Sequence, residues 1–167
     1  MSAPTLNAEQ NTGGVRTAGM EALWALMLPQ LSRGGTVQLT VSGNSMYPML
    51  RSRQDTVVLR KDENLCKGDL IFFRREDGSF VLHRIIRVKD ADHFLVCGDN
   101  QYEPETVARG QVHAKMTAYI RGGKTRGAEN AGYKAYVAIW VWLFPMRRPL
   151  LAIRRFFGRV RSKLKRK

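Results

Sequence analysis

A serine in a short turn-forming segment has the setting that a nucleophile needs. Residues 42–50 read SGNSMYPML, with Ser45 at the centre. The segment follows a predicted strand, and a hydroxyl in a turn after a strand is exposed yet held by the scaffold. Gly43 can adopt a positive φ, and Pro48 stiffens the exit from the turn. Taken alone, this composition is also typical of an ordinary turn.

Three later segments add residues that can take part in chemistry. Residues 67–71 read KGDLI, residues 81–86 read VLHRII around His83, and residues 97–100 read CGDN around Asp99. A histidine titrates near neutrality and is the side chain most often used as a general base. Taken alone, a histidine on a predicted strand is more often a core or cross-strand residue.

The four segments resemble, in the same order, the boxes of the signal peptidase family and of its relatives, the LexA-type self-cleaving repressors. The resemblance covers residues 41–105 and neither end of the chain. It implies a mainly β, LexA/signal peptidase-like domain. It also implies a serine endopeptidase that cleaves a signal or leader peptide, or a preprotein, through an acyl-enzyme. We expect no cofactor and no metal, because the histidines and cysteines lack ligand spacing.

Within that resemblance, His83 stands where most bacterial members carry a lysine base, as in the endoplasmic-reticulum type that also occurs in archaea and some bacteria. A lysine base must lose its charge through burial, whereas a histidine needs a partner on its other ring nitrogen. The resemblance offers Asp99 and Glu105 for that partner. We favour Asp99 as the orienting or structural acid, with a turn-capping role as its alternative and Glu105 as the second choice. We therefore expect Asp99→Asn to cost more activity than Glu105→Gln.

The resemblance also assigns the remaining site residues. Gly43, Met46 and Pro48 are expected to contact the substrate, and the backbone N–H of Ser45 is the expected oxyanion donor. Gly43 stands where some relatives carry a serine hydroxyl that provides a second donor. The expected substrate is an extended peptide along a strand edge, with small side chains near the scissile bond.

Periodicity predicts the elements that must position these residues. Helical spacing predicts an amphipathic helix over 18–32, after a disordered start over 1–17. Alternation and turn residues then predict the strands 36–42, 55–60, 69–74, 79–89, 93–97 and 111–121. We predict a catalytic domain over 18–121, a linker over 122–132 and a helical, membrane-interacting tail over 133–167.

The net charge of +14 is concentrated in the tail. Residues 147–167 contain ten Lys or Arg and no acid, which leaves +4 for residues 1–146. Residues 135–144 read AYVAIWVWLF, an apolar run too short to span a bilayer. Aromatic and basic residues in this pattern predict an interfacial helix on an anionic membrane, and we expect residues 133–167 to be removable without loss of the catalytic domain. The alternative is a helix that packs on the β domain.

Localisation and function classes follow from the same features. Residues 1–17 do not have the pattern of a signal peptide, so we expect a peripheral membrane protein, cytoplasmic by default. We do not expect a nucleic-acid partner, because no recognised binding module accompanies the basic tail. Two alternatives to the peptidase are a LexA-like self-cleaving or regulatory module and a degenerate peptidase fold that acts as a basic membrane-binding module.

Overall fold

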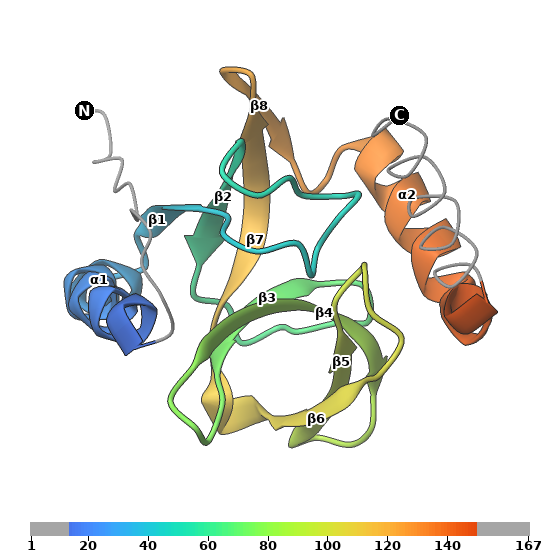
Figure 1. Ribbon diagram of the computed structural model, residues 1–167, viewed down its shortest axis with the longest axis horizontal. Coiled ribbons are helices and arrows are strands. Elements are labelled where there is room, and N and C mark those ends of the chain that lie inside the picture. Colours follow the sequence, from blue (N-terminus) through green and yellow to red (C-terminus); the bar gives the residue numbers. More distant parts are fainter. Residues whose placement is uncertain (1–13, 150–167) are drawn as a thin grey trace, which may run out of the picture.

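Helix α1 (Gly14–Ser32) opens the part of the chain that the structure, a computed structural model, describes: residues 14–149 (Figure 1). It begins earlier than the predicted helix, so residues 14–17 are helical rather than disordered. The rest of the predicted disordered start lies outside the described residues. Met27 and Leu31 face the sheet and are buried, whereas Leu26 and Leu28 are exposed. The amphipathic pattern therefore fixes the face by which α1 packs.

Eight antiparallel strands form the body of the molecule and confirm the predicted mainly β fold. They are β1 (Thr36–Thr40), β2 (Asp55–Arg60), β3 (Leu70–Arg74), β4 (Phe80–Val88), β5 (His93–Cys97), β6 (Glu105–Ala108), β7 (Val112–Arg121) and β8 (Lys124–Gly127). The order across the sheet is β1-β2-β7-β3-β4-β5-β6, and β8 pairs with β7. The sheet curls so that β3 to β6 form the rounded lower half of the molecule in Figure 1.

Two of these strands are absent from the sequence prediction. β6 is short, follows Pro104 and buries only Val107, so it has almost no alternating pattern. β8 is exposed along its whole length and reads KTRG, within the predicted linker 122–132. Gly122 and Gly123 both have positive φ and turn β7 directly into β8, which is the geometry that a Gly-Gly pair favours in a hairpin.

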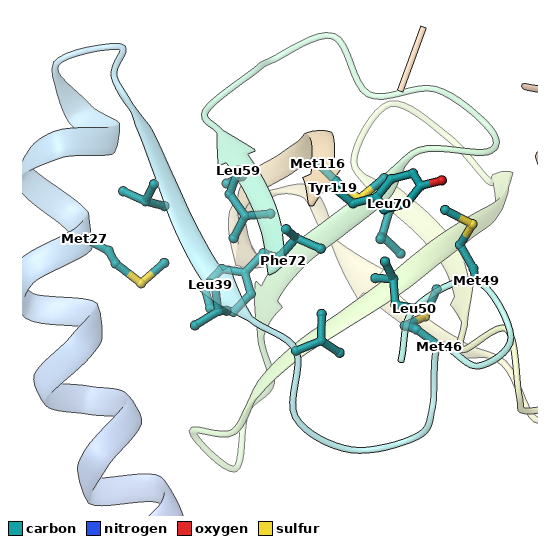
Figure 2. Packing of buried hydrophobic residues seen from close by; sticks show 14 of the residues in the cluster. Met27, Leu39, Met46, Met49, Leu50, Leu59, Leu70, Phe72, Met116 and Tyr119 are labelled. Carbon is teal, nitrogen blue, oxygen red and sulfur yellow. The ribbon is translucent and has the colours of Figure 1, made fainter. Parts of the chain in front are cut away.

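The strands bury two hydrophobic clusters on either side of β3. Leu70 and Phe72 point into the larger cluster, which also contains Met27 of α1 (Figure 2). Ile71 and Phe73 point into the smaller one, which β4, β5 and β6 enclose. Successive side chains of a strand alternate between faces, so a strand that is covered on both sides is apolar throughout. β3 is thus the central strand of the fold.

Helix α2 (Ala131–Trp142) packs on the opposite side of the strands from α1 (Figure 1). Its first turn is capped by the Asn130 side chain, which accepts hydrogen bonds from the N–H groups of Gly132 and Tyr133. Tyr133 and Val141 are buried against the strands. A short 3-10 turn, η2 (Phe144–Met146), follows. No helix within residues 14–149 has the length and apolarity to cross a bilayer.

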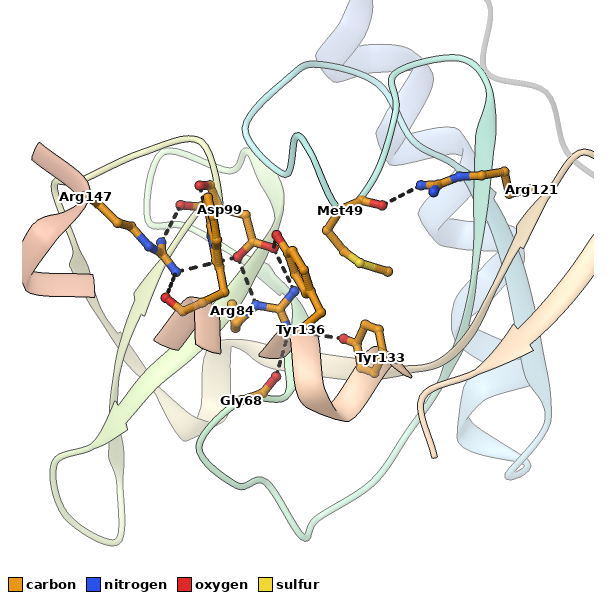
Figure 3. A network of polar contacts seen from close by, with 10 residues as sticks. Met49, Gly68, Arg84, Asp99, Arg121, Tyr133, Tyr136 and Arg147 are labelled. Atoms are coloured by element: carbon orange, nitrogen blue, oxygen red, sulfur yellow. Dashed lines mark hydrogen bonds and ion pairs between the residues drawn. The ribbon is translucent and has the colours of Figure 1, made fainter. Parts of the chain in front are cut away.

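A buried ion pair attaches α2 to the strands (Figure 3). Arg84 of β4 donates two hydrogen bonds to the Asp99 carboxylate, at 2.9 and 2.7 Å, and both side chains are fully buried. Tyr136 of α2 donates to the same carboxylate at 3.2 Å, and Trp140 donates to the Asp99 carbonyl at 3.1 Å. Arg84 also donates to the hydroxyl of Tyr133. The start of the predicted tail is therefore part of the core, and its removal would uncover this pair.

We predict that Asp99→Asn strongly destabilises the fold, because it leaves the buried Arg84 guanidinium without a carboxylate. Breaking one side of a buried ion pair costs about 3–5 kcal/mol. Urea unfolding at neutral pH measures this loss, and the exposed, nearby Glu103→Gln serves as the matched charge-removal control. Equal urea midpoints for Asp99→Asn and the wild type would contradict the role given to the pair.

Candidate active site

Consecutive residues of β4 serve opposite faces of the sheet. His83 and Arg84 are neighbours on the strand, so their side chains point in opposite directions. Arg84 meets Asp99 on the side that α2 covers, as described above. His83 faces the other side and is 3% exposed. The strand therefore separates a structural charge pair from an imidazole that can do chemistry.

The Ser45 segment lies beside His83. Ser45 and His83 both line a groove of about 220 Å³ between the residues that follow β1 and the start of β4. Met46 also lines this groove and is 2% exposed, so it anchors the segment in the larger hydrophobic cluster. Ser45 itself is only partly buried, which leaves the serine accessible from the groove.

The turn after β5 holds the Ser45 segment in place. The N–H of Asn100 donates to the Ser45 carbonyl at 2.7 Å, and the Asn100 side chain donates to the Asn44 carbonyl at 3.1 Å. At the other side of the segment, Gly43 has φ of +85°, as expected, and its N–H donates to the Ser52 hydroxyl. The backbone around Ser45 is thus fixed from both directions.

Glu105 is the acid that contacts His83. Its carboxylate lies 2.9 Å from His83 Nδ1, and because a carboxylate only accepts, Nδ1 carries the hydrogen. Glu105 pairs with Val96 of β5, and β5 lies between β4 and β6. The two side chains therefore meet across the end of β5. This arrangement fixes the ring and turns Nε2 away from Glu105.

Gly98, directly after β5, lets His83 and the Ser45 backbone approach each other closely. A Cβ atom there would lie 3.1 Å from His83 Nε2 and 2.7 Å from the Ser45 carbonyl oxygen. Both separations are closer than a methyl group tolerates without movement of its neighbours. The absence of a side chain at residue 98 thus lets the imidazole and the Ser45 backbone approach the same point.

Arg75 completes the charge arrangement from the turn between β3 and β4. Its guanidinium donates two hydrogen bonds to Glu105, at 2.6 and 2.7 Å, the bidentate geometry that an arginine and a carboxylate favour. Burial alone would raise the pKa of Glu105, but the hydrogen bonds from His83 and Arg75 outweigh it and lower that pKa to about 2. Glu105 is therefore ionised at every pH at which a histidine titrates.

The structure brings together some of the predicted site residues and separates others. Ser45, Met46 and His83 line one groove, and Glu105 joins them through His83. Of the two roles expected of Asp99, the orienting one is wrong, because Asp99 lies on the α2 side and is bonded to Arg84, which is a structural role.

Two predicted substrate contacts are not among the residues that line this groove. Pro48 lines a different pocket, beside Tyr119 and Arg121, and Gly43 is not part of the groove lining. Sequence reasoning missed Arg75 and Gln101, which both line the groove with Ser45. Arg75 precedes an Asp-Gly turn, and nothing in its sequence setting distinguishes it from a surface arginine. Gln101 directly follows the CGDN segment, and that adjacency was its only signal.

A family model described as Peptidase S24-like matches residues 10–120, which is more than half of the chain. The match includes Ser45, His83 and Glu105 and ends before α2. No curated protein matches the chain.

The lowered pKa of Glu105 predicts how its contribution to stability depends on pH. A carboxyl whose folded-state pKa is depressed adds stability above its unfolded value, about 4.3, and loses it as the pH falls towards the folded value of about 2. We expect the wild type to be more stable than Glu105→Gln at neutral pH. The difference should shrink between about pH 4.5 and pH 2. Urea unfolding of both proteins over this range measures it.

Glu103→Gln is the control for this experiment, because Glu103 is exposed and lies two residues away. Its stability should follow that of the wild type at neutral pH. A difference between wild type and Glu105→Gln that stays constant down to pH 2 would show that the carboxylate is not held by His83 and Arg75.

Proposed function

Because the chain belongs to the Peptidase S24-like family, we propose that it is a serine endopeptidase in which Ser45 is the nucleophile, His83 the general base and Glu105 the residue that orients His83. The finer part of this proposal is that the enzyme is of signal-peptidase type and cleaves a signal or leader peptide, or a preprotein. The observation that carries the proposal is the shared groove of Ser45 and His83, with Glu105 on the far ring nitrogen.

The arrangement supports a two-step acyl transfer. His83 Nε2 takes the hydroxyl proton as the Ser45 oxygen bonds to the peptide carbonyl carbon, and the resulting oxyanion is stabilised by the Ser45 N–H. His83 then gives this proton to the leaving nitrogen as the C–N bond breaks. Water, deprotonated by His83, releases the acyl group and restores the serine. Glu105 stays ionised throughout and stabilises the imidazolium.

The groove also supports an extended peptide as substrate. Its walls are the residues that follow β1, Val41 and Ser42, and the first part of β4. Phe80 of β4 also lines the groove, and the centroid of its ring lies 5.4 Å from that of the Trp24 ring of α1. Small side chains next to the scissile bond stay a prediction.

Helix α1 favours cleavage of a separate chain over self-cleavage within the described residues. A peptide must be extended to lie along a strand edge. The residues before β1 are helical instead, and Met27 and Leu31 are buried in the core. To bring residues 14–32 into the groove would require α1 to unfold from that core. We therefore place the LexA-like self-cleaving module second.

We predict that Ser45→Ala abolishes both labelling by a fluorophosphonate probe and cleavage of signal-peptide-like substrates. Loss of the nucleophile removes the covalent pathway, and turnover should fall roughly 1,000-fold or more. Mass spectrometry of the labelled protein locates the probe, and thermal unfolding checks that the variant is folded.

Ser42→Ala is the matched control, since Ser42 is a second serine that lines the same groove. It should keep most of the labelling. Cleavage that survives in Ser45→Ala would refute the peptidase proposal, and an unlabelled wild type would favour a degenerate fold without catalysis.

We also predict that Glu105→Gln lowers turnover far more than Asp99→Asn when both variants are compared below their unfolding temperatures. Loss of the orienting acid in a serine triad costs about four orders of magnitude. The wild-type rate should fall on acidification, because a general base accepts the serine proton only in its unprotonated form. Glu105 does not contribute to this fall, because its pKa is about 2. A flat rate from pH 5 to pH 9 would count against a histidine base.

A further inference from the structure

Helix α2 has two faces with different tasks. Its inner face is fixed by directed contacts: Tyr136 and Trp140 donate to Asp99, and Tyr133 accepts from Arg84. Arg147, just beyond η2, is 1% exposed and donates to the Gly98 carbonyl at 3.2 Å. These bonds determine the rotation of the helix about its own axis. The side chains on its outer face therefore cannot turn inwards without breaking a buried network.

The outer face carries large apolar side chains. Ile139 is 58% exposed, Trp142 is 78% exposed and Met146 is 57% exposed. The first two are three residues apart, so they lie on one side of the helix, and Met146 follows in η2. Ala135 and Ala138 of α2 are also exposed. A continuous apolar stripe with a tryptophan on it is unusual for a surface that faces only water.

Strong positive charge follows this stripe directly. Beyond the buried Arg147, residues 148–167 contain nine Lys or Arg and no acid. A tryptophan-bearing apolar face next to a cluster of basic residues matches an anionic lipid surface in both respects, since the apolar face enters the acyl boundary and the charges meet the headgroups. A helix of 12 residues is about 18 Å long, which suits a position in the plane of the interface.

We propose that the outer face of α2, formed by Ile139, Trp142 and Met146, binds an anionic lipid surface while the inner face stays on the Gly98–Asp99 turn. The inference does not depend on the peptidase reaction. It also restricts the membrane contact that the sequence predicts for residues 135–144. Trp140 and Val141 of the apolar run pack inwards, so only one face of that run is available to lipid.

The apolar stripe distinguishes this occupant from two others. A nucleic acid would use the basic residues but has no use for an exposed Trp142 and Ile139 beside them. A second copy of the chain would cover the stripe, but it would place two strongly basic segments close together, at a cost in repulsion. Anionic lipid is the partner that satisfies the apolar and the charged surface at once.

Vesicle co-sedimentation of the full-length protein tests the proposal. We expect binding to vesicles of phosphatidylcholine with phosphatidylglycerol, and little binding to phosphatidylcholine alone. Binding should weaken with added salt without vanishing, because screening acts on the charges and not on the apolar contact. The double variant Ile139→Ser/Trp142→Ser should bind about tenfold less at low salt.

Leu26→Ser/Leu28→Ser is the matched control, because it removes two exposed apolar residues from α1 on the other side of the molecule. It should bind like the wild type. Quenching of the wild-type tryptophan fluorescence by brominated lipid gives a second measurement that needs no variant.

Three results would overturn the proposal. The first is that the α2 double variant binds vesicles as well as the wild type does. The second is that an oligonucleotide competes fully with the vesicles and that brominated lipid does not quench the tryptophan fluorescence. The third is that the wild type is a dimer and the α2 double variant is a monomer. None of these results depends on cleavage, so failure here is distinguishable from failure of the proposed peptidase.

Discussion

The buried pair of Arg84 and Asp99 is the interaction on which the rest of the structure depends. Neither side chain is exposed, so each needs the other to remain charged in the interior. The pair fixes the turn after β5. Asn100 of that turn then holds the Ser45 carbonyl through a hydrogen bond. It also supplies the polar surface on which α2 docks. The Arg84–Asp99 pair thus determines where three segments that are distant in the sequence must lie: the Ser45 segment, the turn after β5 and α2.

The alternation of a β-strand lets one short segment serve both sides of this arrangement. His83 and Arg84 are adjacent, yet one faces the groove and the other faces α2. The same division separates the two acids. Glu105 lies across the end of β5 from His83 and is exposed enough to meet Arg75, while Asp99 is enclosed. The residues of the proposed site and the residues that support it are therefore close in space, but no side chain belongs to both sets.

The sequence predicts the parts of this molecule that depend on local pattern. Alternation and turn residues place six of the strands, and the Ser45 and His83 segments carry enough detail for the fold and the central pair of the site. The choice between Asp99 and Glu105 depends on which face of the sheet each side chain reaches, which is a matter of register across β5. Arg75 acts through a partner 30 residues away, and α2 folds against charges that its own apolar run does not reveal.

The contacts around the Gly98–Asp99 turn also join residues that leave the ribosome at different times. Arg147 follows Gly98 by 49 residues, which is several seconds of synthesis at roughly 5–20 residues per second. Until α2 has emerged, the Asp99 carboxylate lacks Tyr136 and the turn that fixes Ser45 lacks its cover. The nascent chain therefore carries Ser45, His83 and Glu105 well before the support of that turn is complete. Maturation of the groove is in this way tied to the synthesis of residues 131–147.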